Sequence, residues 1–245
     1  MLAHRMRRLL GDRTHYSLLA LDHGLTFGHS VDAAQLPAGD LLNRCSDHIG
    51  GFVMTYGLAR ALDGWPHRLS LVLQCFGAPK GQSKFQIASV SQAITLDAAA
   101  VSVQLSWADT ELASRLREIC AFTSEAHSAS LPVLYMIGGE SNTSALPHAI
   151  RVCQELGADL IKINCSLDNF MCDHEDVKSV LRYGPPVLMA GGAVSQDIFQ
   201  FAQNAARLGF SGYCVGRNIF HANDPSDVVV QLNTIFSNES KGVAK

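Results

Sequence analysis

One lysine in an apolar segment, Lys162, is the residue in this sequence best suited to covalent chemistry. It lies in Gly157-Ala-Asp-Leu-Ile-Lys-Ile-Asn-Cys165, a pattern that predicts a helix end followed by a buried strand. Strand alternation places Lys162 and Asn164 on the same face. Burying an unpaired ammonium is costly, so such a group tends to become a neutral amine, which can attack a carbonyl and form a Schiff base. The alternative is a structural lysine paired with a buried carboxylate.

A carboxylate and a histidine end the first expected strand, in the segment Leu21-Asp-His-Gly24. Strand alternation places Leu18 and Asp22 on the same face. If that face is the barrel interior, Asp22 reaches the same space as Lys162. Schiff-base chemistry needs a general acid and base for dehydration and for proton transfer at the substrate. We expect Asp22 to fill that role and His23 to contact the substrate. The alternative is an Asp that only caps a loop.

Two glycine-rich turns near the end of the chain predict an anion site. Gly191-Gly192 follows the seventh expected strand, and Gly216 with Arg217 follows the eighth. Glycines allow backbone N–H groups to approach an anion closely, a short helix beginning at Arg217 would point its N-terminus there, and the guanidinium adds a planar donor. Together these turns indicate a phosphorylated ligand, although the Gly191-Gly192 pair alone could be a tight turn.

The elements that must position these residues alternate between short apolar strands and amphipathic helices. Such alternation predicts a parallel sheet, and eight units in 245 residues match a (β/α)8 TIM barrel, whose active site lies at the C-terminal ends of the strands. We expect one domain over residues 1–245, with residues 1–10 as a short capping helix; a doubly wound sheet is the alternative. The expected strands are residues 16–21, 51–56, 69–76, 99–105, 131–137, 159–164, 186–190 and 212–215.

Composition excludes several classes of function. The net charge of -3, with no block of like charge, argues against nucleic acid as a partner. Seven cysteines without a CxxC pair suggest reduced thiols in the cytoplasm, and ten histidines without an HxH or HxxxH pair argue against a zinc mechanism. No apolar run is long enough to span a membrane, and the first ten residues lack the apolar core of a secretion signal. We expect neither a metal nor a cofactor.

Other polar signals are expected to be structural. Lys80 and Lys84 lie in a polar loop, where lysines stay solvated and protonated, so they are poor nucleophiles that could at most contact an anionic substrate. Lys178 is expected to face solvent. Asp109 and Ser195 are expected to cap helices, and Gly209 to end the second of them.

In combination, four motifs resemble the archaeal-type class I aldolase superfamily, which includes fructose-bisphosphate aldolases and 2-amino-3,7-dideoxy-D-threo-hept-6-ulosonate synthases. They are, in order, Leu-Asp-His-Gly, Gly-Ala-Asp-Leu-Ile-Lys, Ala-Gly-Gly and Val-Gly-Arg-Asn-Ile-Phe, and they cover nearly the whole chain from Leu21 to Phe220. The resemblance implies a TIM barrel, a homo-oligomer, a Schiff-base Lys162, an acid/base Asp22, and a phosphate site at Gly191, Gly192, Gly216 and Arg217.

The chain departs from this family at the end of the fifth expected strand. The family usually has Tyr-Pro-Arg-Gly there, with the tyrosine as proton donor, whereas this sequence places Gly138 at the tyrosine position. Tyr135 would face the helices, and Tyr56 is a candidate only if its side chain turns inward. Either Asp22 or a water takes over the proton step, or the reaction differs. Cys165 also stands where a tyrosine is common.

The segment Val101-Ser-Val-Gln-Leu-Ser106 resembles the heptulosonate-synthase branch more than the sugar-bisphosphate aldolases. We therefore expect a Schiff-base aldolase that joins a keto-phosphate such as dihydroxyacetone phosphate to an aldehyde such as aspartate semialdehyde. Gly138 and Asn164, like His23, are expected to contact substrate. Three alternatives remain: fructose-bisphosphate aldolase, a thiolase-like acyl transferase acting on a phosphorylated diketone, and a non-catalytic barrel that binds a phosphorylated ligand.

Overall fold

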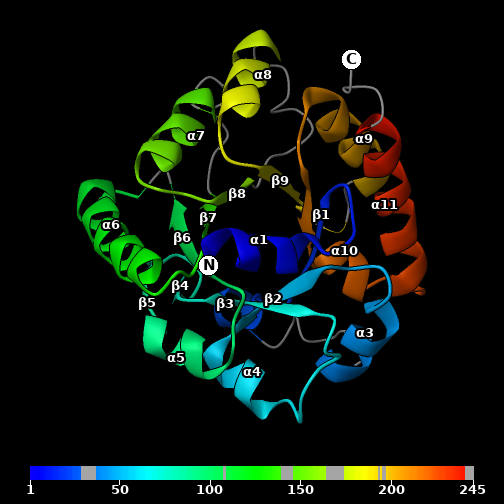
Figure 1. Cartoon of the computed structure of the whole chain (residues 1–245), viewed down its shortest axis with the longest axis horizontal. Helices are drawn as coiled ribbons and strands as arrows, with labels where there is room; N and C mark the ends of the chain where they lie inside the picture. Colours follow the sequence, from blue (N-terminus) through cyan, green and yellow to red (C-terminus); the bar gives the residue numbers. More distant parts are fainter. Residues whose placement is uncertain are drawn as a thin grey trace.

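A computed structural model of the chain shows how these segments are arranged. It describes residues 1–28, 37–106, 109–138, 146–163, 174–192, 194 and 197–240. The N-terminal helix and all eight expected strands are present in it, and the strands form one closed barrel. Figure 1 looks into this barrel, with helices arranged around the strands. The predicted (β/α)8 barrel is therefore confirmed.

Neighbouring strands of the barrel are parallel, as short apolar segments separated by helices require. Their order around the barrel is β1-β10-β9-β8-β7-β6-β3-β2. The strands are β1 (Tyr16–Ala20), β2 (Gly51–Thr55), β3 (Ser70–Gln74), β6 (Ala100–Ser106), β7 (Val133–Gly138), β8 (Leu160–Ile163), β9 (Val187–Ala190) and β10 (Gly212–Val215).

The third expected strand is wrong at its C-terminal end. β3 stops at Gln74, and the chain then forms a separate antiparallel ribbon in which β4 (Phe76–Gly77) pairs with β5 (Phe85–Gln86). The turn between these two short strands includes Gly81, whose φ of 82° is in the left-handed region. The polar loop at residues 78–84 is therefore anchored at both ends by ribbon pairing.

Helices surround the barrel and cover its outer face. They are α1 (Leu2–Leu10), α2 (Gly24–Phe27), α3 (Ala38–Cys45), α4 (Tyr56–Ala61), α5 (Val90–Thr95), α6 (Leu112–Ser128), α7 (Leu146–Glu155), α8 (His174–Tyr183), α9 (Ile198–Leu208), α10 (Arg217–Phe220) and α11 (Pro225–Ser240). None of these described helices combines the length and apolar character that a membrane span requires.

Two expected helix caps differ in the structure. The side chain of Asp197, not Ser195, caps α9 by accepting hydrogen bonds from the backbone N–H groups of Phe199 and Gln200, and Ser195 itself lies outside the described residues. Asp109 lies three residues before α6 and accepts a hydrogen bond from the backbone N–H of Glu111, without capping the helix. The expected stop at Gly209 is confirmed, with φ at 100°.

The core has an inner and an outer layer because alternate residues of each strand face opposite ways. The inner layer fills the barrel with apolar side chains, among them Leu18, Val72, Leu134, Leu160 and Leu188. The larger outer layer packs the other strand face against the helices. Since barrel strands are buried on both faces, they read as nearly continuous apolar runs in the sequence.

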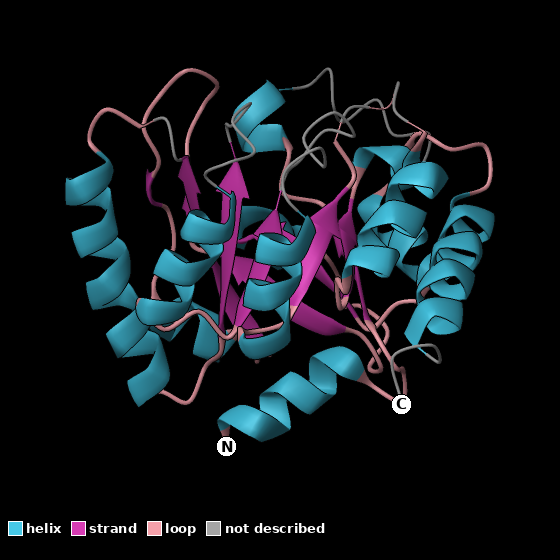
Figure 2. Ribbon diagram, turned by 90° about the horizontal axis from the view of Figure 1, so that it is seen from above, coloured by secondary structure: helices cyan, strands magenta, loops and turns pink. Residues whose placement is uncertain are grey.

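Helix α1 closes the N-terminal end of the barrel. Figure 2 shows it lying across that end, while the strand arrows point towards the opposite end. Its Leu9 is fully buried in the inner layer, and Arg5 donates a hydrogen bond to the carbonyl oxygen of Ala98 at 2.6 Å. Arg8 pairs with Asp97 at 2.9 Å. With one end closed in this way, access to the interior is from the C-terminal ends of the strands.

Candidate active site

A cavity opens at the C-terminal end of the barrel, where this fold places its active sites. Every predicted site residue that the structure describes lines it. These are Asp22, His23, Gly138, Lys162, Gly191, Gly192, Gly216 and Arg217. The ninth, Asn164, lies outside the described residues, as does Cys165. Residues from five separate segments of the sequence thus meet in one place.

Lys162 lies in the middle of β8 and points into the barrel. It pairs in register with Met136 of β7 and Leu188 of β9, and its exposed fraction is 8%. It lies close enough to Cys214, on β10, for its charge to act on the thiol. The primary amine of Lys162 therefore lies between apolar side chains of the inner layer and reaches the cavity.

Asp22 directly follows β1 and lies beside His23, with 3.8 Å between its Oδ1 atom and Nδ1 of the imidazole. The side chain of Asp22 is 9% exposed. The charges of Asp22, Lys162 and Arg217 all act on His23, and those of Asp22 and Lys162 both act on Cys214. A carboxylate, an amine and a guanidinium therefore share one small cavity, in which their interactions are stronger than in bulk water.

The imidazole of His23 is neutral at neutral pH. Its pKa is lowered to about 4, chiefly by burial; the charges of Lys162 and Arg217 also lower it, whereas the Asp22 carboxylate raises it. The ring also packs on Phe220, with 5.6 Å between the ring centres. A neutral, packed imidazole can offer a hydrogen bond to a ligand without adding a positive charge to the cavity.

The low pKa of His23 predicts a loss of stability in acid. Because the folded-state pKa lies below the unfolded value of 6.5, the contribution of His23 to stability is complete above pH 6.5 and is lost as pH falls towards 4. The free energy of unfolding should fall by up to about 3 kcal/mol over this window. Urea unfolding at several pH values should show a smaller loss for His23→Gln, and an equal loss in both proteins would contradict the assignment.

The glycine turns are shaped by close contacts that exclude side chains. A Cβ atom at Gly216 would lie 2.3 Å from the carbonyl oxygen of Ala20, and one at Gly191 would lie 2.7 Å from Val215. The φ of Gly192 is 62°, which favours glycine. Asn218 donates a hydrogen bond to the carbonyl oxygen of Gly191 at 2.7 Å and so ties the two turns together.

Arg217 adds a positive charge beside these turns. Its guanidinium lies over the ring of Phe27, 5.0 Å from the ring centre. Its buried Nε atom has no hydrogen-bond partner among the described residues. Since a buried polar group usually has a partner, this N–H is available to an anion bound at the turns.

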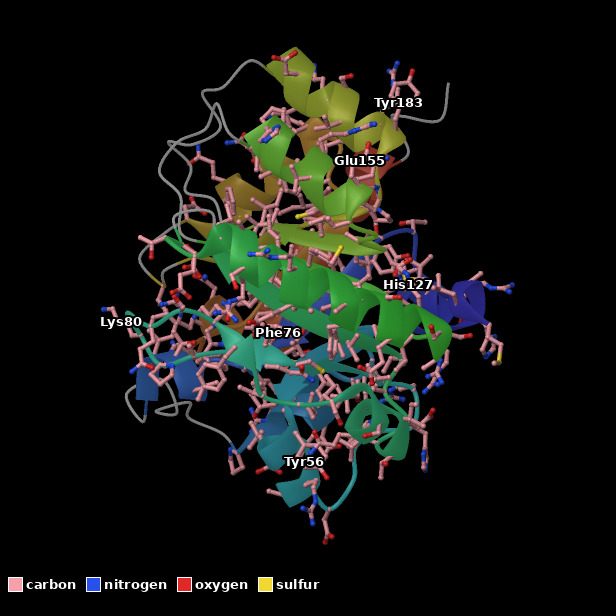
Figure 3. The ribbon with its side chains drawn as sticks, turned by 90° about the vertical axis from the view of Figure 1, so that its left-hand side faces the viewer. Tyr56, Phe76, Lys80, His127, Glu155 and Tyr183 are labelled. Atoms are coloured by element: carbon pink, nitrogen blue, oxygen red, sulfur yellow. The ribbon has the colours of Figure 1, made fainter. Side chains whose placement is uncertain are left out.

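Gly138 leaves open space at the end of β7. An added Cβ atom there would meet no described residue within 4 Å. Neither tyrosine considered as a proton donor reaches this space. Tyr56 begins α4, where Arg60 lies over its ring, and Figure 3 labels it at the edge of the molecule. Tyr135 faces the helices, as the alternation predicted.

Tyr135 is held by two hydrogen bonds on the outside of the barrel. Its hydroxyl donates to the carbonyl oxygen of Leu156 at 3.1 Å and accepts from Thr123 at 2.8 Å, and burial raises the pKa of the phenol. Tyr135→Phe should therefore lower the free energy of unfolding by about 1–3 kcal/mol and leave activity unchanged. Denaturant unfolding and steady-state kinetics measure both; a large loss of activity in a folded variant would place Tyr135 in the reaction.

Several residues that line the cavity were not predicted from the sequence. Gln104, Met136 and Cys214 point inwards from β6, β7 and β10, and Thr26 and Phe27 of α2 line the rim. The inward position of Gln104 could have been predicted from the sequence, because Ser102, Gln104 and Ser106 are polar at alternate positions of an otherwise apolar strand.

The expectation that both loop lysines are solvated is wrong for one of them. Lys80 is exposed and lies at the outer edge of the molecule in Figure 3. Lys84 is partly buried, and burial lowers its pKa while the Asp22 carboxylate raises it. Pairing of β4 with β5 brings Lys84 back towards the barrel mouth. Lys178 is exposed, as expected.

No group of three or more His, Cys, Asp or Glu side chains within the described part of the chain is arranged to hold a metal ion. What the cavity offers is a buried primary amine, an adjacent carboxylate, a neutral imidazole, and a guanidinium next to glycine turns. These groups are suited to covalent attack on a carbonyl, proton transfer and anion binding, respectively.

Comparisons with known proteins agree with this chemistry. The sequence model described as DeoC/LacD family aldolase matches residues 17–222. A protein of Streptomyces griseus, named 2-amino-4,5-dihydroxy-6-oxo-7-(phosphonooxy)heptanoate synthase, is 27% identical over 247 residues, covering 93% of this chain and 87% of that protein. A solved archaeal fructose 1,6-bisphosphate aldolase superposes with a TM-score of 0.84 at 22% identity, covering 97% of this chain and all of the other.

A second solved structure is of an archaeal fructose-1,6-bisphosphate aldolase whose catalytic lysine is covalently bound to the carbinolamine intermediate of its substrate. It superposes with a TM-score of 0.80 at 21% identity, covering 98% of this chain and all of that one. At these identities, the two structural likenesses support the fold.

Proposed function

The chain belongs to the DeoC/LacD aldolase family, and from this premise we propose that it makes or breaks a carbon–carbon bond through a Schiff base on Lys162. The match confirms the resemblance to class I aldolases that the motifs indicated. The observation that carries the proposal is the position of Lys162, a buried amine that shares one cavity with a carboxylate and with the glycine turns beside Arg217. No other described lysine has these surroundings.

The proposed reaction begins with attack of the Lys162 amine on the ketone carbon of a keto-phosphate. Loss of water gives an imine, which acidifies the neighbouring carbon, and removal of its proton gives an enamine. That carbon bonds to the aldehyde carbon of the second substrate, whose oxygen takes up a proton. Water then hydrolyses the imine and frees Lys162. Asp22 is positioned to accept and return these protons, because it lies at the same cavity.

Dihydroxyacetone phosphate is the keto-phosphate that we propose, with aspartate semialdehyde as the aldehyde. The name of the Streptomyces griseus relative supports this choice, since it describes a seven-carbon amino acid with a ketone beside a phosphorylated carbon. Breaking such a chain between its two hydroxyl-bearing carbons gives a three-carbon keto-phosphate and a four-carbon amino aldehyde. The phosphate would bind at Gly191, Gly192, Gly216 and Arg217.

Borohydride trapping tests the proposal directly. Incubation with dihydroxyacetone phosphate and borohydride should add the mass of the reduced donor to the peptide that contains Lys162, because reduction converts an imine into a stable amine. Dihydroxyacetone, which is the donor without its phosphate, serves as the comparison and should label Lys162 more slowly. Wild-type protein that acquires no mass on this peptide would exclude the Schiff-base mechanism.

Arg217→Met should weaken donor binding while leaving the chemical step largely intact. The methionine retains apolar contact with Phe27 but loses the charge and the N–H donors, so KM for dihydroxyacetone phosphate should rise about 10- to 100-fold with a smaller change in kcat. Steady-state kinetics measure this, with Arg182→Met, an exposed arginine on α8, as the matched control. An unchanged KM would remove Arg217 from the phosphate site.

A further inference from the structure

A second cavity lies next to the one that contains Lys162, on the side away from the glycine turns. Gln104 and Gly138 line both cavities. The other walls of the second cavity come from the loop between β4 and β5, the end of β6 and the residues before α6. Its volume is about 430 Å³, whereas the first cavity has about 120 Å³. Small-molecule sites usually measure a few hundred Å³, so the first cavity is too small for two reactants and the second has room for one.

The two cavities meet near Lys162. Strand register places Gln104 opposite Met136 and Met136 opposite Lys162, so these three inward-facing residues lie side by side around the barrel. Gly138, the next inward-facing residue of β7 after Met136, pairs with Ser106 of β6. The absence of a side chain at Gly138 leaves open space there. A molecule in the second cavity can therefore reach the carbon activated at Lys162 without passing the phosphate turns.

One positive and one negative side chain line the second cavity. Lys84 is partly buried, and its ammonium is close enough to Asp22 for the two charges to interact. Among the described residues, no carboxylate forms an ion pair with Lys84. Asp109 is held in place, since its Oδ1 atom accepts hydrogen bonds from the backbone N–H of Glu111 at 2.9 Å and from the hydroxyl of Ser83 at 3.1 Å.

We propose that this second cavity binds the acceptor aldehyde and selects one that carries both a carboxylate and an ammonium group. Lys84 binds the carboxylate and Asp109 binds the ammonium, while Gln104 and Gly138 leave the aldehyde carbon free to approach the enamine. A phosphorylated aldehyde would bring a dianion towards Asp109, and a neutral aldehyde would leave both charges unpaired. The inference rests on the proposed aldolase function, because it assigns the second substrate of that reaction.

Four acceptors, each combined with dihydroxyacetone phosphate, test the charge requirement. L-aspartate 4-semialdehyde carries both groups, succinate semialdehyde carries only the carboxylate, butanal carries neither, and D-glyceraldehyde 3-phosphate carries a phosphate. We expect kcat/KM to fall about 10-fold with each charged group that is removed, and to be lower for the phosphorylated aldehyde than for L-aspartate 4-semialdehyde. A preference for glyceraldehyde 3-phosphate, or equal use of all four acceptors, would overturn the proposal.

Two variants assign the charges to residues. Lys84→Met should lower kcat/KM about 30-fold for both carboxylate-bearing aldehydes and less than threefold for butanal, whereas Asp109→Asn should affect only L-aspartate 4-semialdehyde, by about 10-fold. Lys80→Met, on the same loop but outside both cavities, should match wild type. Equal losses for all acceptors in either variant would contradict a role in acceptor selection.

Trapping of the donor alone separates this inference from the proposed function. Borohydride labelling of Lys162 by dihydroxyacetone phosphate should still occur in wild type, Lys84→Met and Asp109→Asn, which also shows that the variants are folded. If wild type is not labelled, the Schiff-base mechanism is wrong. If all three proteins are labelled but the acceptor preferences do not change, the mechanism stands and the acceptor site is wrong.

Discussion

Lys162→Met is expected to lower kcat/KM for aldol formation and cleavage by about 10⁴-fold or more and to abolish borohydride labelling by the donor. Without the amine no imine forms, and no other group in the cavity can supply the same electron sink. Methionine has a similar length and suits the apolar neighbours Leu160, Met136 and Leu188, so the variant should fold. Far-ultraviolet circular dichroism and a thermal melt check this separately from activity.

Lys178→Met is the matched control for this experiment. Lys178 is exposed on α8, so its replacement should leave labelling and turnover at wild-type levels. Mass spectrometry of the digested wild-type protein should place the reduced donor on the peptide with Lys162 and on no other. A Lys162→Met protein that still turns over substrate would show that the carbon–carbon bond is handled without this amine.

Much of the barrel could be predicted from the sequence because its strands are buried on both faces. Each strand is a short apolar run between helices, so its existence is a local property of the chain. The residue at which a strand ends depends more on distant parts of the chain. The third strand was expected to continue to Phe76, which is apolar, but Phe76 pairs with Gln86 in a ribbon outside the barrel. Nothing within residues 69–76 indicates that this later segment competes for the pairing.

The cavity residues were predicted from the alternation of side chains along each strand and from their position at strand ends. Because alternate side chains of a barrel strand share a face, finding Lys162 and Asp22 required only the strand register. Lys84 could not be found in this way. Its partial burial depends on the β4–β5 ribbon, which returns the loop to the barrel mouth, where the Asp22 carboxylate acts on its charge. In the sequence alone it looks like Lys80, which is exposed.

The second large effect is expected for Asp22→Asn, because the proposed reaction requires repeated proton transfers and Tyr135 and Tyr56 lie away from the cavity. The amide has nearly the same shape as the carboxylate but cannot accept the proton from the donor carbon. We expect kcat to fall about 10²- to 10⁴-fold, with little change in KM for dihydroxyacetone phosphate, whose phosphate binds elsewhere. Labelling by borohydride should be slower but still occur, since Lys162 remains.

Exchange of the donor's carbon-bound hydrogen with deuterated water isolates the step assigned to Asp22. Wild type should exchange it without any acceptor, and Asp22→Asn should lose this exchange by the same factor as turnover, because both depend on enamine formation. Asp12→Asn, at an exposed position before β1, is the control and should exchange normally. Since the Asp22 side chain is only 9% exposed and lies 3.8 Å from a neutral imidazole, exchange that persists in Asp22→Asn would move the proton transfer to His23 or to a bound water.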